Sequence, residues 1–149
     1  MKIRIVAVLL VAALATVAFT AVAADTPAVE ANIVQLNPAP EMFTFRGPVT
    51  VEYQLMIKNP LPDRTITLTR IGLRTQGRDG AYSLRADDPI TFTINADSSA
   101  TLTLSASGRS NGGFMQSSEP VNLLVQLSFD QQDGKSFSKQ FVQYLPQDE

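Results

Sequence analysis

The sequence contains no cysteine, no histidine and no tryptophan among its 149 residues. Without histidine there is no Ser-His-Asp triad, no Cys-His pair and no imidazole to act as a general base near neutral pH. Without cysteine there is no thiolate nucleophile, no disulfide and no cysteine-based zinc site, and a blue-copper centre would lack both of its main ligand types. These absences exclude nucleophilic catalysis through cysteine or histidine and electron transfer through copper.

Charged residues are also sparse. The chain has 12 basic and 14 acidic side chains, a formal net charge of −2, and charged residues make up 17% of it. A slightly acidic chain with scattered arginines lacks the basic footprint of a nucleic-acid-binding protein, so we expect no nucleic-acid partner. Apolar residues at 44% of this length predict one domain with a hydrophobic core.

The N-terminal segment has the composition of an export signal. Two basic residues precede an apolar run at 5–15, and the small residues Ala-Val-Ala follow at 21–23. A charged start, an apolar stretch and an Ala-x-Ala end are typical of a cleavable secretory signal. We predict a helical signal peptide at residues 1–23, with cleavage before Ala24 or one residue later. The alternative is an uncleaved anchor, because residues 5–24 are long enough to span a bilayer.

Removal of residues 1–23, which include two of the basic side chains, leaves 126 residues with a formal net charge of −4. We therefore expect the protein in the periplasm or outside the cell. We expect the protein to contact a membrane only through this N-terminal segment, and only if the segment is not cleaved. We predict no cofactor.

Three prolines surround a short apolar stretch at 31–36. Proline is tolerated in extended leaders and edge strands but not in central strands. Residues 24–41 are therefore interpreted as a proline-containing leader with one edge strand, followed by a β-domain at 42–149.

From residue 49 onward the sequence alternates as β-strands do. Val49, Val51, Tyr53, Leu55 and Ile57 occupy every second position, and mostly polar residues lie between them. Further strands are expected at 66–73, with a bulge near 69–71, and at 82–84, 90–94, 102–106, 121–129 and 136–144, with breaks at 59–63, 87–89 and 108–120. No stretch after the signal keeps a helical period. The pattern predicts an all-β, antiparallel immunoglobulin-like sandwich of seven or eight strands, and a small closed β-barrel is the alternative.

Two segments carry a family resemblance. Residues 53–73 (YQLMIKNPLPDRTITLTRIGL) resemble the strand, Asn-Pro turn and strand of water-stress sandwiches of the late-embryogenesis-abundant type. Residues 95–104 (NADSSATLTL) are similar to a turn into a strand in exported bacterial fibronectin-like modules. The resemblance implies a non-enzymatic sandwich and identifies no ligand.

Carboxylates are the remaining candidates for acid-base chemistry. Asp87 and Asp88 are adjacent and precede Pro89, so a turn or capping role is favoured over a catalytic pair. Five other aspartates lie in predicted turns without the spacing of a calcium loop: Asp63, Asp79, Asp97, Asp130 and Asp133. We predict no metal site and no catalytic residue.

Five arginines fall within 22 positions: Arg64, Arg70, Arg74, Arg78 and Arg85. On neighbouring strands they could form a positive stripe for an anionic glycan, a lipid headgroup or an acidic partner. Acidic residues are interleaved with them, so a solvated face that protects strand edges is the favoured interpretation.

The glycine-rich segment 108–120 is long for a connection between strands, and long loops often carry function. We predict a partner-binding patch of Arg109, Asn111, Phe114 and Met115. The favoured competing interpretation has Phe114 closing one end of the sandwich.

Two functions remain open. The first is a periplasmic or secreted, non-catalytic β-sandwich that binds a protein or a cell-envelope component, and this is the one we favour. The second is a small hydrolase or calcium-dependent enzyme that relies on Asp and Glu, and it requires carboxylates to converge in a pocket.

Overall fold

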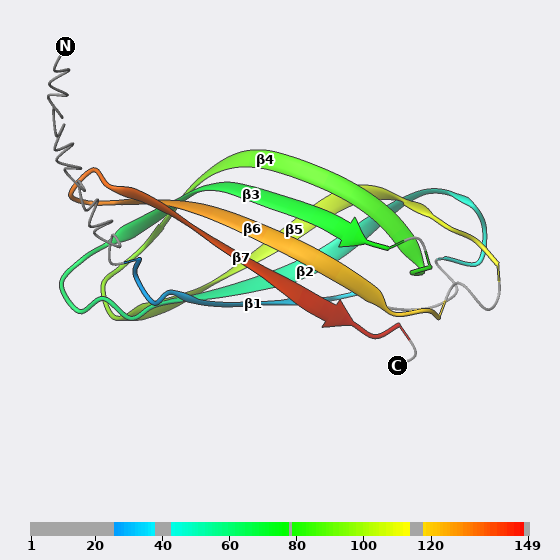
Figure 1. Ribbon diagram of the computed structural model, residues 1–149, viewed down its shortest axis with the longest axis horizontal. Helices are drawn as coiled ribbons and strands as arrows, with labels where there is room; N and C mark the ends of the chain where they lie inside the picture. The colour runs from blue at the N-terminus through cyan, green and yellow to red at the C-terminus, as the bar shows by residue number, and fades with distance from the viewer. Residues whose placement is uncertain (1–25, 38–42, 78, 114–117, 148–149) are drawn as a thin grey trace, which may run out of the picture.

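The computed structural model describes residues 26–37, 43–77, 79–113 and 118–147. The predicted signal peptide, Arg78, Phe114 and Met115 lie outside these ranges. The described residues form seven strands (Figure 1): β1 (Glu30–Gln35), β2 (Gly47–Asn59), β3 (Ile66–Gln76), β4 (Tyr82–Ile94), β5 (Ser98–Ser110), β6 (Val121–Gln131) and β7 (Ser136–Leu145). No helix within these ranges is both long enough and apolar enough to span a membrane.

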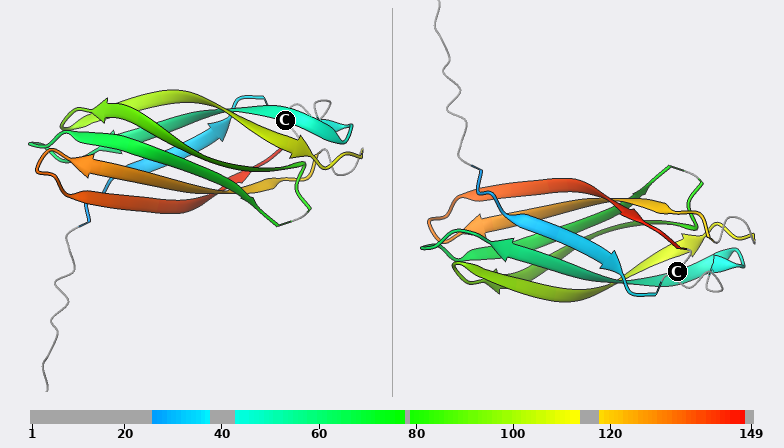
Figure 2. Two further views of the ribbon diagram at one scale, coloured as in Figure 1. Left: turned by 90° about the horizontal axis from the view of Figure 1, so that it is seen from above. Right: turned by 90° about the horizontal axis from the view of Figure 1, so that it is seen from below.

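The strands form one antiparallel sheet in the order β1-β2-β5-β4-β3-β6-β7. The sheet curls until β1 approaches β7, so the fold is a nearly closed, flattened barrel. Figure 2 shows the two flattened halves, β1-β2-β5 and β4-β3-β6-β7, facing each other across the core. The prediction of an all-β antiparallel protein is confirmed, and the barrel alternative fits the nearly closed sheet.

Side-chain amides join the two edges of the sheet. Gln35 at the end of β1 donates from Nε2 to Oε1 of Gln147, which follows β7, at 3.0 Å. Gln147 donates in return to Oε1 of Gln35 at 2.8 Å. The reciprocal pair satisfies both amides in a largely buried position, so it holds the barrel edges together without continuous strand pairing.

The alternating pattern of β2 is confirmed. Val51, Tyr53, Leu55 and Ile57 are buried, and Val49 is half-buried at the end of the strand. β2 pairs along its full length with β5 and also pairs with β1, which explains why it carries the most regular pattern in the chain.

The predicted bulge in the next strand is also confirmed. The register of β3 shifts between Leu68 and Arg70 against both β4 and β6. The shift allows Ile66 and Leu68 before it and Ile71 after it all to face the core, although strict alternation would turn Ile71 outward.

The predicted break at 87–89 is wrong, because β4 runs without interruption from Tyr82 to Ile94. Pro89 pairs with Arg70 of β3, beside the bulge. β4 pairs with β5 only at residues 82–84. Beyond residue 84, among the described strands, β4 is paired with β3 alone, so its other edge is unpaired. A proline without an N–H is tolerated in a strand that has one unpaired edge.

One predicted boundary also moves. β5 continues to Ser110, so its last three residues occupy the start of the segment that was expected to be a loop. The edge strand expected within the leader at 24–41 is present as β1, which contributes the buried side chain of Ile33 to the core and follows the buried Val29.

A buried asparagine fixes the turns at one end of the barrel. Asn59, at the end of β2, donates from Nδ2 to the carbonyl oxygens of Arg64 (2.8 Å) and Asn95 (3.0 Å). Its Oδ1 accepts from the amide of Leu61 at 3.2 Å. This one side chain ties the β2–β3 connection to the β4–β5 turn, so the Asn-Pro sequence has a structural role in addition to ending the strand.

Candidate functional site

Two of the four predicted contact residues, Arg109 and Asn111, lie at the end of the barrel where β5 finishes. Arg109 is exposed and lies opposite Pro48 of β2 and Ser83 of β4. Its guanidinium is therefore available to a partner. Phe114 and Met115 fall outside the described residues, so their predicted role stays a prediction.

Asn111 has a structural role. Its amide N–H donates to the carbonyl of Ala81 at 3.1 Å, and its Nδ2 donates to the carbonyl of Gly80. Its carbonyl accepts from Nε of Arg46 at 2.8 Å. These bonds fasten the start of the 111–113 segment to the β3–β4 turn and to the segment before β2, so the Asn111 side chain is already occupied.

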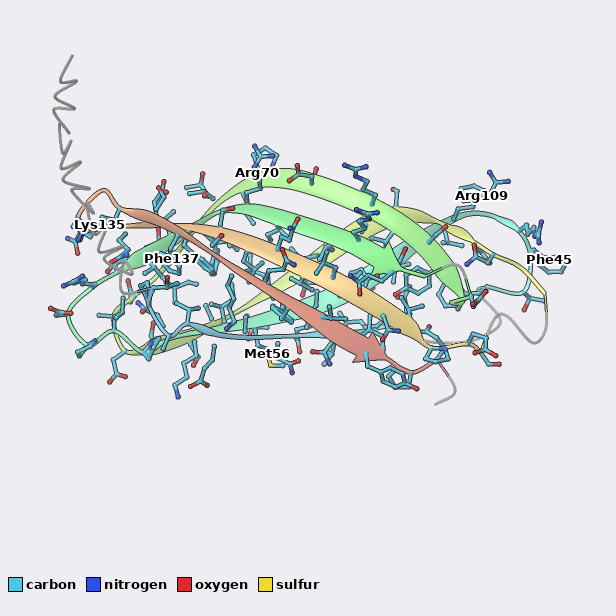
Figure 3. The ribbon with its side chains drawn as sticks, viewed as in Figure 1. Phe45, Met56, Arg70, Arg109, Lys135 and Phe137 are labelled. Atoms are coloured by element: carbon cyan, nitrogen blue, oxygen red, sulfur yellow. The ribbon has the colours of Figure 1, made fainter. Side chains whose placement is uncertain are left out.

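The structure exposes an aromatic residue that the sequence analysis missed. Phe45 is 82% exposed and lies at the same end of the molecule as Arg109 (Figure 3). The signal in the sequence was the alternation of Phe43 and Phe45 just before β2, which indicates one inward and one outward aromatic. An exposed phenylalanine of this size is a candidate contact residue.

Contacts behind Phe45 hold its segment in place. Phe43 is fully buried, and its ring lies 5.1 Å from that of Tyr82. The hydroxyl of Ser110 donates to the carbonyl of Phe43 at 2.7 Å, and the amide of Gly113 donates to the carbonyl of Thr44 at 3.0 Å. These bonds fix the backbone before Phe45, and the pairing of Gly47 with Ser110 fixes it shortly after, so Phe45 projects from a well-held segment.

A buried polar network continues inward from this end. The hydroxyls of Tyr53 and Tyr82 lie 2.8 Å apart, and the Tyr82 hydroxyl donates to Oε1 of Gln35 at 2.8 Å. Burial raises the pKa of both phenols well above the ordinary value, most strongly for Tyr53, whose pKa is raised further by its interaction with Tyr82. Both phenols therefore stay neutral at physiological pH, and the network acts as a structural support rather than as an acid-base device.

The arginines separate into two groups. Arg70 pairs with Asp87 at 3.1 Å, and Arg64 lies 3.8 Å from both Asp63 and Asp133. These pairs fit the predicted solvated face. Arg74 and Arg85 behave differently, because they lie directly opposite each other on β3 and β4.

The carboxylates do not converge. Among the described residues there is no group of three acidic side chains that could hold a metal ion. Asp87 and Asp88 lie within a strand rather than in the predicted turn, so they point to opposite sides of β4. Asp87 binds Arg70 on the outer face, whereas Asp88 lines a groove on the other side.

That groove lies between β4 and β5. Its volume is about 250 Å³, and the residues that line it are Ile71, Leu73, Ala86, Asp88, Pro89, Ile90, Thr103, Leu104, Ser105 and Ala106. β4 and β5 are joined by a short turn and pair at residues 82–84 and 108–110. If this pairing continued in the same register towards the turn, Ile94 would lie opposite Ser98. These two residues flank the turn. The strands thus resemble a long hairpin that parts in its middle, and we call this opening the β4–β5 groove.

Two other hollows lie on the outer faces of the sheet. One, of about 260 Å³, lies over Gly72 and is lined mainly by polar residues, including Arg70, Gln126 and Gln140. The other, of about 370 Å³, is open and lies over β1, β2 and β5 around Met56 and Ala100. Each is lined by one carboxylate that is ion-paired, Asp87 with Arg70 in the first and Glu30 with Lys58 in the second, so neither brings two carboxyl groups together.

No protein-family model matches the chain, and no curated protein matches it in sequence. Solved structures match the fold. A Northeast Structural Genomics Consortium target, SoR45, is 12% identical with a TM-score of 0.53, and the match covers 79% of this chain and 84% of that one. A structure described as "Putative ApaA Protein from Bordetella pertussis" is 11% identical with a TM-score of 0.50, over 81% of this chain and 94% of that one. At such low identity these similarities concern the fold alone.

Proposed function

We propose that the protein is an exported, non-catalytic binding module that takes up an extended segment of a partner protein in the β4–β5 groove. The observation that carries this proposal is the separation of β4 from β5. β4 and β5 are joined by a turn and are paired with each other at their far ends. The facing edges of residues 85–94 of β4 and 98–107 of β5 are not paired with each other.

Unpaired strand edges recognise extended peptides. Each edge offers backbone N–H and C=O groups that a third strand can bond, and alternate side chains of that strand then enter pockets of the groove. The lining of the β4–β5 groove suits this role, because half-buried apolar side chains such as Ile90 and Leu104 alternate with exposed polar ones. A volume of about 250 Å³ is below the usual size of a small-molecule site, roughly 300–1,000 Å³, but accommodates a few peptide side chains.

The alternative function is a small hydrolase or calcium-dependent enzyme built on Asp and Glu. Glycoside hydrolysis needs two carboxyl groups about 5–10 Å apart across a cleft, and calcium needs several oxygen ligands. Asp88 is the one carboxylate among the residues that line the β4–β5 groove. A single carboxylate beside apolar side chains favours peptide binding over either chemistry.

Two finer assignments belong to the same proposal. The facing halves of the sheet support an immunoglobulin-like arrangement and are compatible with the similarity to water-stress sandwiches. The Ala-x-Ala sequence near residue 23 supports export to the periplasm or the exterior. Both partner classes inferred from the sequence, a protein or a cell-envelope component, remain within its scope, and the groove favours a protein.

Site-specific photocrosslinking in cells of the source organism tests the proposal. A photoreactive residue at position 88 lies in the groove, whereas the same residue at exposed position 132, in the β6–β7 turn, serves as the matched control. We expect a discrete covalent adduct with a partner protein from position 88 and none from position 132. Mass spectrometry of the adduct should locate the crosslink in an extended segment of the partner.

A groove-filling variant completes the experiment. Ala86→Phe introduces a large side chain into the β4–β5 groove, and Ala100→Phe introduces the same side chain into the hollow over β1, β2 and β5. We expect the position-88 adduct to disappear in the first variant and to persist in the second, provided that both unfold at the same urea concentration as the parent. An adduct that survives Ala86→Phe, or equal adducts from positions 88 and 132, would overturn the proposal.

A further inference from the structure

A second surface, outside the β4–β5 groove, carries unneutralised positive charge. Arg74 and Arg85 lie directly opposite each other on β3 and β4. Arg109 of β5 lies opposite Ser83, two residues before Arg85 along β4. Together with Arg46, which is bonded to the carbonyl of Asn111, these exposed residues make up what we call the arginine end.

Among the described residues, the charge at the arginine end has no carboxylate partner. In the described ranges, no carboxylate lies within 4.0 Å of the guanidinium of Arg46, Arg74, Arg85 or Arg109, whereas Arg64 and Arg70 both have such partners. Asp87 lies two residues from Arg85 along β4 but is engaged by Arg70 at 3.1 Å. Like charges directly opposite each other on antiparallel strands destabilise the pair, so an external anion that bridges Arg74 and Arg85 is favoured.

An apolar group lies beside these charges. Phe45 is 82% exposed, immediately precedes Arg46, and lies with Arg109 at one extremity of the molecule (Figure 3). The three surface hollows described above are lined by residues other than Phe45 and the four arginines. The aromatic ring therefore projects from the surface rather than lining a cavity, which suits an extended surface better than a ligand that needs to be enclosed.

We propose that the arginine end docks on an anionic lipid surface. Aromatic side chains favour the boundary between headgroups and acyl chains, so Phe45 enters that layer. Arginine side chains beside it reach the lipid phosphates, to which a guanidinium can donate paired hydrogen bonds. The four guanidinium groups have no carboxylate partner among the described residues, and their complementarity to a negatively charged layer selects the anionic surface. This surface is separate from the N-terminal segment, which is the other part of the chain expected to contact a membrane.

Flotation with vesicles tests the proposal. Each variant is isolated from cells in the same way, so that all variants share the same N-terminus. The protein is then mixed with vesicles of phosphatidylcholine alone, or of phosphatidylcholine and phosphatidylglycerol in equal amounts. We expect binding to the anionic vesicles to exceed binding to the neutral ones and to decrease as salt is raised, because ions screen exposed charges.

Matched variants assign the effect to this surface. Removing two arginines with Arg74→Gln and Arg85→Gln should lower the apparent affinity for anionic vesicles at least about tenfold, because each basic residue near such a surface contributes roughly fivefold. Arg64→Gln with Lys135→Gln makes the same change in charge away from the arginine end, where Asp133 lies beside both side chains, and should leave the affinity unchanged. Phe45→Ser should weaken binding to anionic vesicles several-fold, with unchanged urea stability.

Three results would overturn the inference: equal binding to neutral and anionic vesicles, equal losses in the two charge variants, or full binding by Phe45→Ser. None of them bears on the crosslink at position 88, so the two proposals fail independently.

Discussion

The hydroxyl oxygens of Tyr53 and Tyr82 lie 2.8 Å apart in the core, and the Tyr82 hydroxyl donates to Oε1 of Gln35 at 2.8 Å. A phenol has a single proton, so Tyr53 is the donor within the tyrosine pair. Tyr82 therefore accepts one hydrogen bond and donates another, whereas Tyr53 only donates. This asymmetry makes two chemically identical substitutions unequal.

Tyr82→Phe should destabilise the protein more than Tyr53→Phe. The first substitution leaves the buried Tyr53 donor without an acceptor, whereas the second leaves the Tyr82 proton bonded to Gln35. We expect a loss of about 2 kcal/mol in the free energy of unfolding for Tyr82→Phe and about 1 kcal/mol for Tyr53→Phe. Urea unfolding measures both, and a larger loss for Tyr53→Phe would contradict the assigned direction of the bond.

Stability should fall at alkaline pH. Burial raises the pKa of both phenols above 10.0, so the folded protein keeps protons that the unfolded chain releases near pH 10. Because the unfolded state binds fewer protons there, the free energy of unfolding is unaffected by these groups below about pH 9 and decreases as the pH rises above about 10.

A Tyr144→Phe variant isolates this effect, because Tyr53 and Tyr82 are then the only tyrosines. During an alkaline titration, tyrosinate absorbance should rise together with the loss of β-sheet circular dichroism. Full ionisation of both phenols at pH 10 with the sheet intact would show that the pair is not buried as described.

Two glycines with positive φ should respond differently to alanine. Gly112 (φ 71°) is buried, and a Cβ there would come within 2.8 Å of the backbone nitrogen of Arg46. Gly134 (φ 83°) has open space around it. Backbone strain alone should cost about 1 kcal/mol at Gly134→Ala, whereas strain plus the clash should cost about 3 kcal/mol at Gly112→Ala. Urea midpoints compare them, and equal costs would contradict the packing around Gly112.

β1 should behave as part of the core. Ile33 is fully buried, whereas Leu36, just after the strand, is 45% exposed. We expect Ile33→Ala to lower the free energy of unfolding by about 2–4 kcal/mol and Leu36→Ala by less than about 1 kcal/mol. If thermal or urea unfolding of Ile33→Ala matched that of the parent, residues 24–41 would be a leader without a structural role.

Processing of the N-terminus should be visible in the intact mass. Protein recovered from the periplasm or the medium is expected to begin at Ala24 or Asp25, because small residues precede both positions. A Val22→Ala variant should be processed like the parent, whereas replacement of Ala21 and Ala23 by large residues should block cleavage before Ala24 and leave cleavage before Asp25, which follows Val22 and Ala24. Exported protein that retains Met1 would support the uncleaved anchor instead.

The regular strands were predictable, because their side chains alternate between the core and solvent. The alternation of Val51, Tyr53 and Leu55 predicted β2. The change in the phase of the apolar residues between Leu68 and Ile71 predicted the bulge in β3. The break predicted at Asp87-Asp88-Pro89 failed because the sequence contains no information on which edges of a strand are paired. Pro89 is compatible with a continuous strand only because β5 has parted from β4 at that point.

The candidate surfaces were predictable only in part. Arg109 was identified and is exposed, but Asn111 makes hydrogen bonds through its amide N–H, its side-chain Nδ2 and its carbonyl, which link it to residues far away in the sequence. Phe45 was overlooked because its exposure depends on Phe43, two residues earlier, being buried against Tyr82. The opposition of Arg74 and Arg85 follows from the register of β3 and β4, which a bulge sets.

The absence of cysteine, histidine and tryptophan by itself determined which chemistries are excluded. The alternation of apolar residues by itself determined that the fold is built of antiparallel strands. These properties depend on residue type and local spacing, which a sequence states directly. The tertiary structure alone decided that the sheet curls into a nearly closed barrel, that β4 and β5 part to form a groove, and that Arg74 lies opposite Arg85 without a carboxylate partner among the described residues. Those features depend on strand order and register, which result from packing between segments distant in the chain.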